Sequence, residues 1–542
     1  MNELSSLSRP SGDTAAASTP WWRGASIYQI YPRSFADSNG DGIGDLPGIT
    51  ARLEHVADLG VDAVWIAPFY TSPMRDFGYD IADYRGVDPI FGTMADFDAL
   101  VAKAHGLGLK LLVDQVYSHT SDQHEWFKTS RTSRINAKAD WYVWADAKPD
   151  GSPPSNWQSV FGGPAWRWDA RRGQYYLHNF LAEQPQLNCH NPDVQDALLD
   201  VARFWLDRGV DGFRVDAINF AMHDPQLRDN PPAPDDGRAR TRPFNFQQHL
   251  YNQSHPNIPH FIKRLRALMD SYEAIFTVAE VGGPDPQAEM HAFTRGDTHF
   301  NSAYSFDFLY AEQLTPALVR DALEQWQGGG DEGWPSWAFA NHDAPRWISR
   351  WAPADARIAY ARMVMALFIA LRGNIILWQG EELGLTQVEI PFERLQDPEA
   401  IANWPLTLSR DGSRTPMVWC DGAPHGGFSE AEPWLPIGED HFTLAVSKQT
   451  GDEHSLLELT RHLLGVRQAN AALCAGSLTV EGAQGHLLLF HREHDGQRIT
   501  CAYNMGTQPM DWLGPDGAVL ASVGGASANH LPAYSGVIID SI

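Results

Sequence analysis

Arg214 and Asp216, two residues apart, form a pair whose side chains could do chemistry together. They lie in residues 209–219, where an entering Gly and the Val and Phe residues predict a buried strand. Alternate side chains of a strand share a face, so the guanidinium and the carboxylate point the same way. A guanidinium keeps a neighbouring carboxylate ionised, as an enzymatic nucleophile requires. A structural ion pair would give the same pattern, so this segment alone leaves both interpretations open.

Two further acids follow predicted strands later in the chain. Glu280 comes directly after a strand predicted at 275–279, and Asp343 comes after one predicted at 336–340, with His342 beside it. In parallel (β/α) folds the carboxyl ends of the strands line the site, so we expect these acids to converge. Two carboxylates suffice for glycoside hydrolysis, one as nucleophile and one as acid/base. Three acids with such neighbours favour an active site over chance core carboxylates.

An oxygen-rich segment precedes all of these, at residues 37–45. Oxygen ligands at alternate positions, with Gly for tight turns, are what a hard cation such as Ca²⁺ or Mg²⁺ needs. The spacing differs from an EF-hand, and the alternative is a solvated Asp/Gly turn. We predict a structural divalent metal ion and no organic cofactor, with these ligands, Ile43 through its carbonyl: Asp37, Asn39, Asp41, Ile43 and Asp45.

The elements that position these residues alternate between strand and helix, which predicts an α/β fold with parallel strands. Besides the strands already named, the pattern predicts strands at 27–31, 61–67, 109–113 and 374–379. Helical spacing predicts helices at 49–59, 97–106, 194–208, 261–271, 360–372 and 456–468.

Three segments interrupt this alternation. Residues 121–192 are Trp-rich with Gly/Pro turns and suggest an inserted domain. Residues 222–242 are rich in Pro and Asp, and they could be a solvated loop or a roof over the site that follows Asp216. Beyond residue 468, short alternating strands at 487–490, 500–503, 519–523 and 535–542 predict a separate all-β domain.

Composition limits the functions that the 542-residue chain can have. A formal net charge of −26 argues against nucleic acid or an anionic membrane surface as a partner. The 20 Trp residues would suit a sugar ligand, and the four Cys show no metal-ligand spacing and suit a reducing compartment. Residues 1–20 lack an apolar core and predict a disordered leader, and no apolar run could span a membrane. We therefore expect a cytoplasmic protein.

Several motifs together resemble glycoside hydrolase family 13, the α-amylase family, and within it the α-glucosidase and oligo-1,6-glucosidase group. The resemblance extends from Trp21 to the end of the chain. It rests on Asp114…His119, Gly212-Phe213-Arg214-Val215-Asp216, Val278-Ala279-Glu280, Asn341-His342-Asp343, Gln184-Pro185-Gln186-Leu187-Asn188 and Arg410-Asp411-Gly412-Ser413-Arg414-Thr415-Pro416.

The resemblance implies a (β/α)8 TIM barrel at 21–120 and 190–465, with domain B inserted after strand three at 121–189. It also implies a C-terminal β-sandwich at 466–542. By motif position, Asp216 would be the nucleophile, Glu280 the acid/base and Asp343 the transition-state stabiliser. The loop at 37–45 matches a divalent-ion site of this group. The residues implied to bind substrate are Asp76, Tyr79, His119, Arg214, His342 and Arg410.

The chain departs from the family pattern at four positions that remove no catalytic group. Ser118 stands where amylases usually have an Asn ligand of their conserved calcium, so we do not expect that ion. Cys189 replaces a Trp, while Ile375 and Trp378 replace a Pro and a Tyr.

The expected activity is that of a retaining, exo-acting α-glucosidase on maltose-type oligosaccharides and α-glucosides, with glucosyl transfer to acceptors. Ala217 follows the nucleophile, where Val goes with α-1,6 activity in the resembling group, so α-1,4 linkages should be preferred. Within the family, sucrose isomerase, trehalose synthase, oligo-1,6-glucosidase and endo-acting amylase are the alternatives. From another class, the non-catalytic transporter heavy chains carry a membrane helix and lack the full acidic set.

Overall fold

Eight parallel strands close into a barrel in the order β1-β13-β12-β11-β10-β9-β5-β2 in the computed structural model, as counted over its described residues. The model describes residues 19–235, 237, 240–304, 306–326, 333–406 and 409–541. The predicted leader at 1–20 lies outside these residues, apart from its last two. The barrel strands are β1 (Ser26–Ile30), β2 (Ala63–Ile66), β5 (Lys110–Val116), β9 (Gly212–Asp216), β10 (Phe276–Glu280), β11 (Ser302–Tyr304), β12 (Trp334–Ala338) and β13 (Asn374–Trp378).

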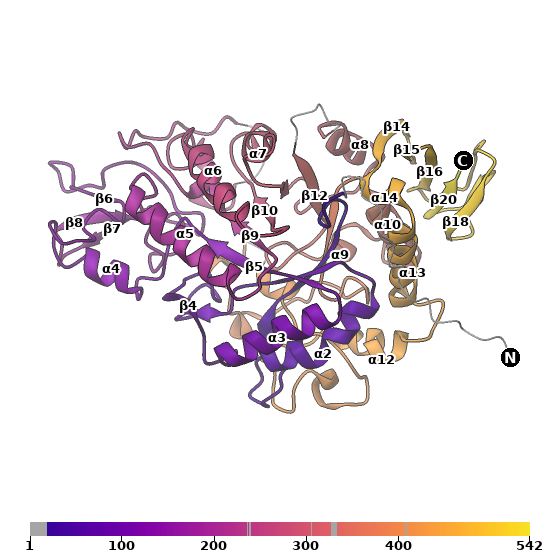
Figure 1. Cartoon of the computed structure of the whole chain (residues 1–542), viewed down its shortest axis with the longest axis horizontal. Coiled ribbons are helices and arrows are strands. Elements are labelled where there is room, and N and C mark those ends of the chain that lie inside the picture. The colour runs from indigo at the N-terminus through magenta and orange to yellow at the C-terminus, as the bar shows by residue number, and fades with distance from the viewer. Residues whose placement is uncertain are drawn as a thin grey trace.

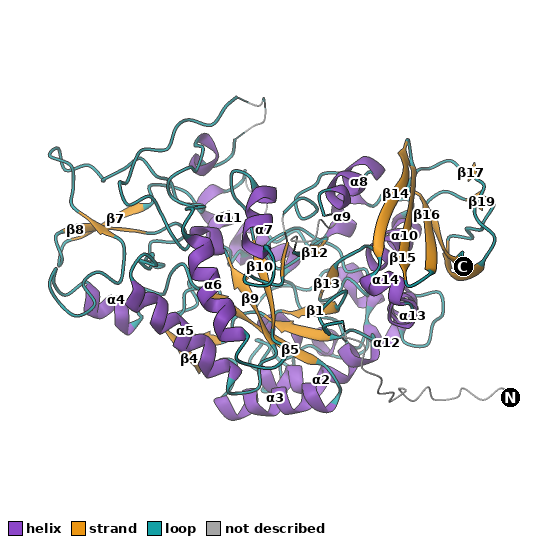
Figure 2. Cartoon of the chain, turned by 45° about the horizontal axis from the view of Figure 1, so that its top comes forward, coloured by secondary structure: helices purple, strands orange, loops and turns teal. Residues whose placement is uncertain are grey.

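Helices cover the outside of the barrel (Figure 2). The strands are apolar and almost wholly buried because helices shield one face and the barrel interior fills the other. The longer helices are α2 (Leu46–Asp58), α3 (Met94–Gly106), α5 (Pro192–Leu206), α6 (Ile258–Met269), α7 (Pro286–Thr294), α8 (Pro316–Glu324), α10 (Arg357–Ala370) and α13 (Leu456–Ala469). The short ones are α1 (Pro32–Phe35), α4 (Glu125–Ser130), α9 (Trp347–Trp351), α11 (Pro398–Asn403), α12 (Val446–Gln449) and α14 (Ala471–Ala475).

Local sequence sets where several of these helices begin. Thr93 and Asp96 form a reciprocal capping box at the start of α3. The Asp45 side chain accepts a hydrogen bond from the Gly48 amide at 2.7 Å and caps α2. The closed barrel of parallel strands with helices around it confirms the predicted (β/α)8 barrel.

The sequence pattern misses one strand and misplaces the end of another. β11 has only three residues, too few to show an apolar alternation. The sequence pattern therefore predicts the other seven barrel strands and misses this one. β12 ends at Ala338, so Asp343 lies in the loop beyond the strand and not at its immediate end. A loop can still carry this acid to the carboxyl edge of the barrel, as the site below shows.

Two smaller units lie at opposite ends of the long axis of the molecule (Figure 1). One follows β5 and contains the sheet β6-β8-β7, formed by β6 (Trp144–Ala145), β7 (Trp166–Asp169) and β8 (Gln174–Leu177), with Trp157 and Trp166 in its core. Two short strands, β3 (Tyr70–Thr71) and β4 (Asp83–Val87), pair before it.

The C-terminal unit is an antiparallel β domain, as predicted. Its five-stranded sheet has the order β14-β15-β16-β20-β18 and begins at Ser477, after α13 and α14. Tyr503 and Arg492 donate hydrogen bonds from this sheet to the carbonyls of Ala366 and Ala370 in α10, at 3.0 and 2.9 Å. The strands are β14 (Ser477–Gln484), β15 (Leu487–His494), β16 (Gln497–Asn504), β18 (Ala518–Val523) and β20 (Ser535–Asp540), with β17 (Met510–Asp511) paired to β19 (His530–Leu531).

Among the helices in the described part of the chain, none has the length and apolar character needed to cross a membrane.

Candidate active site

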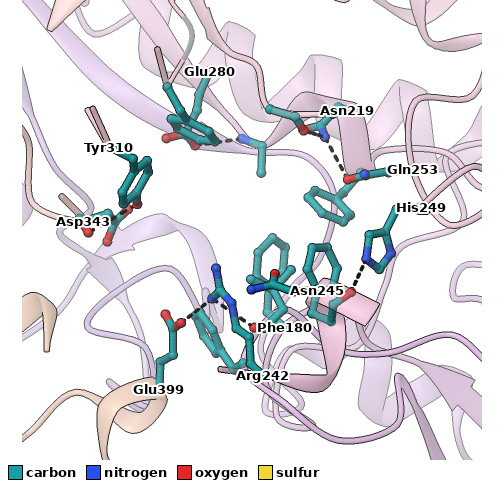
Figure 3. A pocket seen from close by; sticks show the side chains of 18 of the residues that line it. Phe180, Asn219, Arg242, Asn245, His249, Gln253, Glu280, Tyr310, Asp343 and Glu399 are labelled. Atoms are coloured by element: carbon teal, nitrogen blue, oxygen red, sulfur yellow. Dashed lines mark hydrogen bonds and ion pairs between the residues drawn. The ribbon is translucent and has the colours of Figure 1, made fainter. Parts of the chain in front are cut away.

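A cavity of about 960 Å³ opens at the carboxyl ends of the barrel strands (Figure 3). Seven of the predicted catalytic and substrate-binding residues line it, whereas Arg214 and His342 are fully buried behind its wall. The lining members of the predicted set are Asp76, Tyr79, His119, Asp216, Glu280, Asp343 and Arg410. The fold thus brings together residues that lie far apart in sequence.

Arg214 holds three carboxylates from three neighbouring strands. Its Nη1 donates to Asp216 Oδ1 and Asp114 Oδ1, each at 2.6 Å. Its Nη2 lies 2.6 Å from Glu280 Oε2. Parallel pairing of β9 with β5 and β10 creates this arrangement, because the strands end at the same edge. Asp216 and Glu280 therefore contact adjacent nitrogens of one guanidinium.

Tyr304, which the sequence analysis missed, completes the contacts of Arg214 and Glu280. It ends β11 and lies directly across from Glu280 in the strand register. The Tyr304 hydroxyl accepts hydrogen bonds from Arg214 Nε and Nη2 at 3.1 and 3.0 Å, and it lies 3.3 Å from Glu280 Oε1. Because its oxygen already accepts from Arg214, its proton points to Glu280. Recognising the short strand β11 would have been the signal for this residue.

Burial dominates the proton affinity of the two carboxyls that share Arg214. It raises the pKa of Asp216 to about 7 and the pKa of Glu280 to about 7, while Arg214 opposes both shifts. Burial also raises the pKa of Asp114 to about 6. One buried guanidinium cannot balance three buried negative charges, so Asp216 and Glu280 titrate as a pair near neutral pH.

Asp343 lies in a more positive environment than these two acids. Its Oδ1 is 2.6 Å from Arg414 Nη2 and 3.2 Å from Arg410 Nη1, and its Oδ2 is 3.1 Å from His342 Nε2. Burial alone would raise the pKa of Asp343, but His342 and the two arginines outweigh it and hold the pKa below the usual value. This carboxylate is therefore ionised. Arg414 belongs to the same motif as the predicted Arg410 but has no predicted role, and both arginines contact the acid.

His342 is a neutral hydrogen-bonding ring. Gln29 Nε2 lies 2.8 Å from His342 Nδ1, so Nδ1 accepts and the ring proton lies on Nε2. That nitrogen is 2.7 Å from the Tyr79 hydroxyl, and the two rings stack with centroids 5.3 Å apart. Burial lowers the pKa of His342 to about 3, which keeps the ring uncharged at neutral pH.

A second group of charged and polar residues lies in and behind the cavity wall. Arg410 Nη2 lies 3.1 Å from Asp76 Oδ1 and 2.8 Å from Asp397 Oδ1. Gln184 donates to Asp76 Oδ2 at 3.0 Å, and its amide lies 3.1 Å from His119 Nε2. Asp397 has no counterpart in the sequence predictions, and Gln184 belongs to a quoted motif without a predicted role.

The rest of the cavity wall comes from several segments and includes many aromatic side chains. The 222–242 loop contributes Ala233, Pro234, Thr241 and Arg242, so the structure supports the roof interpretation of this loop. Asp236, Arg238 and Ala239 lie outside the described residues. The aromatic lining residues are Phe161, Phe180, Phe220, Phe244, Phe306 and Tyr310.

The oxygen-rich loop at 37–45 is held by its own hydrogen bonds. Asp37 accepts from the amides of Gly40 and Gly42, each at 2.8 Å, and from Ser429 Oγ at 2.5 Å. Burial would raise the pKa of Asp37, but these hydrogen bonds lower it below its usual value. Asn39 and Asp41 accept from the amides two residues further on, at 3.0 and 2.8 Å.

This donor set suits a hard divalent cation, since it offers oxygen atoms and an ionised Asp37. Over the residues that the structure describes, no three or more His, Cys, Asp or Glu side chains are grouped so as to hold a metal ion. The metal site, with Asn39 and the Ile43 carbonyl among its ligands, therefore stays a prediction.

Comparison with known sequences agrees with this geometry. The family model described as alpha amylase, catalytic domain, matches residues 29–476. A probable alpha-glucosidase of Rhizobium meliloti strain 1021 is 53% identical over 529 residues, which are 95% of each chain. An oligo-1,6-glucosidase of Halalkalibacterium halodurans is 36% identical over 537 residues, with 93% of this chain and 94% of the relative covered.

Two solved structures share the whole architecture. The alpha-glucosyl transfer enzyme XgtA is 50% identical with a TM-score of 0.91, over 96% of this chain and 100% of the other. The trehalulose synthase MutB from Pseudomonas mesoacidophila MX-45 is 32% identical with a TM-score of 0.88, over 96% and 99%. The chain is a glycoside hydrolase and belongs to the α-amylase family, glycoside hydrolase family 13, in its α-glucosidase and oligo-1,6-glucosidase group.

Proposed function

We propose that this enzyme is a retaining, exo-acting α-glucosidase that removes terminal glucose from maltose-type oligosaccharides and α-glucosides. The contact of Asp216 and Glu280 with adjacent nitrogens of Arg214, beside a cavity that both acids line, is the observation that carries this proposal. Retaining enzymes need their two carboxyls about 5–5.5 Å apart, and a shared guanidinium keeps two carboxyls close. An inverting enzyme instead needs room for a water molecule between sugar and base.

The first chemical step uses both carboxyls of this pair. Glu280 gives its proton to the glycosidic oxygen while the Asp216 carboxylate attacks the anomeric carbon. The bond from the anomeric carbon to the leaving oxygen breaks, and a covalent glucosyl-Asp216 forms. Near neutral pH the pair holds one proton, so one carboxyl can act as acid while the other acts as nucleophile.

The second step returns the site to its starting state. Glu280, now ionised, takes a proton from water, and the resulting oxygen attacks the anomeric carbon and displaces Asp216. Asp343 remains charged throughout, and its carboxylate stabilises the positive charge that develops on the sugar ring. Two inversions give overall retention of the α-configuration.

The exo-action in this proposal rests on the Asp76–Arg410 ion pair in the cavity lining. In the proposed binding mode this pair stops the substrate at its non-reducing sugar. The hydroxyls of that terminal glucose can bind Asp76, Arg410 and His119, which line the cavity, whereas His342 acts from behind the wall through its contact with Tyr79. An endo-acting amylase needs a cleft that is open at both ends.

An acceptor other than water would turn hydrolysis into glucosyl transfer. A sugar or alcohol hydroxyl that reaches the glucosyl-enzyme can give its proton to Glu280 as water does. The similarity to an alpha-glucosyl transfer enzyme supports this second activity.

Sucrose isomerisation is the second candidate function, because the chain is similar over nearly its whole length to a trehalulose synthase. Isomerisation would share the first step, after which the released fructose would attack the glucosyl-enzyme through another hydroxyl. The fate of that fructose decides between the two functions.

Product analysis tests the proposal. The purified enzyme is incubated separately with maltose, isomaltose and sucrose, and the products are separated by chromatography. We expect glucose from maltose at a higher kcat/KM than from isomaltose, with larger glucosides at high maltose concentration. A dominant conversion of sucrose into isomers that keep both rings linked would favour isomerisation, and the absence of glucose from every α-glucoside would contradict hydrolysis.

A further inference from the structure

We propose that Arg242 and Glu399 form a clasp that limits the length of the leaving group or acceptor in the cavity. The pair is thus a specificity determinant for which sugars react, in addition to the residues that hold the terminal glucose. The inference rests on the proposed α-glucosidase function, whose failure the experiment below distinguishes from failure of the clasp.

The Arg242 guanidinium joins three separate segments of the chain. Arg242 directly precedes the 3-10 helix at Pro243–Phe246, within the loop that roofs the cavity. Its Nη1 donates to Glu399 Oε1, in the first turn of α11, and to the Val160 carbonyl of the inserted domain at 3.3 Å. The roof loop, α11 and the inserted domain therefore meet at one side chain.

A second contact holds α11 against the inserted domain. Asn403 Nδ2 at the end of α11 donates to the Phe161 carbonyl at 3.2 Å. Arg410 lies over the Phe161 ring at 4.9 Å from its centroid. Helix α11, which carries Glu399, is thus held against the inserted domain, and the roof loop contacts it through Arg242.

The clasp is also connected to the charged end of the cavity. Asp397 Oδ1 accepts from the Glu399 amide at 3.1 Å and lies 2.8 Å from Arg410 Nη2. Arg410 in turn contacts Asp343. A chain of ion pairs, continued through the Glu399 amide, therefore connects the proposed transition-state stabiliser to the clasp.

Figure 3 shows the Arg242–Glu399 pair and Glu280 on opposite sides of the open space. Both clasp residues line the cavity and are partly buried, with side-chain exposures of 28% for Arg242 and 11% for Glu399. Their contacts are with each other and with α11 and Val160, and not with Asp216 or Glu280. They therefore belong to the part of the cavity beyond the reacting atoms.

The volume of the cavity agrees with a limit on length. At about 960 Å³ it is near the upper end of the range of small-ligand pockets, about 300–1,000 Å³. A short oligosaccharide fits such a space. A longer one would have to pass between the roof loop and α11, which the clasp joins. A guanidinium beside a carboxylate can also hydrogen-bond neighbouring hydroxyls of a sugar that stops there.

Three variants test the clasp: Glu399→Gln, Arg242→Gln and the double variant. Glu399→Gln keeps the shape and removes the charge. The measurement is the ratio of kcat/KM for maltotriose to kcat/KM for maltose, with thermal melting as the check of folding. We expect each single variant to raise this ratio roughly fivefold, as for the loss of a partly exposed ion pair. The double variant should raise it no further, since one bridge is lost in all three.

Two controls make the result specific. Arg242→Lys keeps the positive charge and should return the ratio toward the wild-type value. Arg394→Gln removes an ion pair of the same type with Glu432, at 2.8 Å, outside the cavity lining, and should leave the ratio unchanged.

An unchanged ratio in folded single variants would overturn the clasp, as would single-variant effects that multiply in the double variant. In either case a wild-type enzyme that releases glucose from maltose leaves the proposed function intact. A wild-type enzyme that releases glucose from neither substrate would instead contradict the α-glucosidase itself.

Discussion

Tyr304 links Arg214, which contacts both catalytic carboxyls, to Glu280, the proposed acid. Arg214 donates two hydrogen bonds to its hydroxyl, which polarises the O–H bond that points to Glu280 Oε1. A donor to the carboxylate favours the ionised form of Glu280 and so counteracts the effect of burial on its pKa. We propose that Tyr304 is a positioning residue that lowers the pKa of Glu280 through this contact.

The Tyr304→Phe variant tests this assignment through the pH dependence of kcat/KM. Glu280 must be protonated in the free enzyme, so activity falls as the pH rises through its pKa, about 7. Loss of the hydroxyl removes a donor to the carboxylate, so the pKa rises and the alkaline limb shifts to higher pH.

The matched control is Tyr503→Phe, which deletes a buried hydroxyl that donates to Ala366 in the C-terminal interface. It should lower stability without moving the alkaline limb. If the alkaline side of the pH profile of kcat/KM stays in place in the Tyr304→Phe enzyme and only the melting temperature falls, the role of Tyr304 is purely structural.

Ala217 combines a lining position with an unusual backbone conformation. Its φ of 36° and ψ of 45° are left-handed, and its amide lies 3.4 Å from Glu280 Oε2. A β-branched residue is strained there, by roughly 1–3 kcal/mol. Ala217→Val should therefore lower the melting temperature, and its added methyl groups should shift the kcat/KM ratio from maltose toward isomaltose. Equal loss on both substrates would mean that Ala217 does not select the linkage.

At the scale of elements, sequence patterns identify most of the barrel because its strands and helices are regular. Seven strands and most of the longer helices follow from apolar runs and helical spacing, but α7 and α8 are not predicted. The family motifs name the catalytic acids. β11 escapes detection because three residues carry no periodicity, and Tyr304 is missed with it. Arg242, Glu399 and Asp397 are missed because their contacts join segments that only the folded chain brings together.

The loop between α1 and α2 carries the metal prediction. We propose that residues 37–45 bind Ca²⁺ or Mg²⁺ and that the ion clamps the loop, since Asp45 also caps α2. Chelation should then lower the melting temperature, while kcat changes little at temperatures where the enzyme stays folded. The site would be contradicted if elemental analysis detected no bound divalent ion and the chelator left the melting temperature unchanged.

At the scale of the whole molecule, buried titratable groups predict a narrow pH range of maximal stability. Burial raises the pKa of Glu381 to about 8, so the stability that this group contributes is lost as the pH rises through that value. Burial lowers the pKa of His223 to about 3 and that of His119 to about 4, so their contribution is lost as the pH falls. The melting temperature should be highest at mildly acidic pH, about 5.5–6.5, and fall on both sides.

Glu381→Gln should flatten the alkaline side of this curve, because Gln keeps the shape of the side chain without the charge. The exposed Glu453 gives the matched control, Glu453→Gln. Calorimetry across this pH range makes the comparison. An alkaline side equally steep in both variants would mean that Glu381 does not contribute to it.

In the proposed mechanism Asp216 becomes covalently attached to glucose. A slow substrate, such as a fluorinated glucosyl fluoride, is incubated with the enzyme, and the digested protein is analysed by mass spectrometry. We expect the peptide with Asp216 to gain the mass of one fluoroglucosyl group, and Asp216→Asn to abolish the label. A label on another residue, or turnover without any covalent adduct, would contradict it.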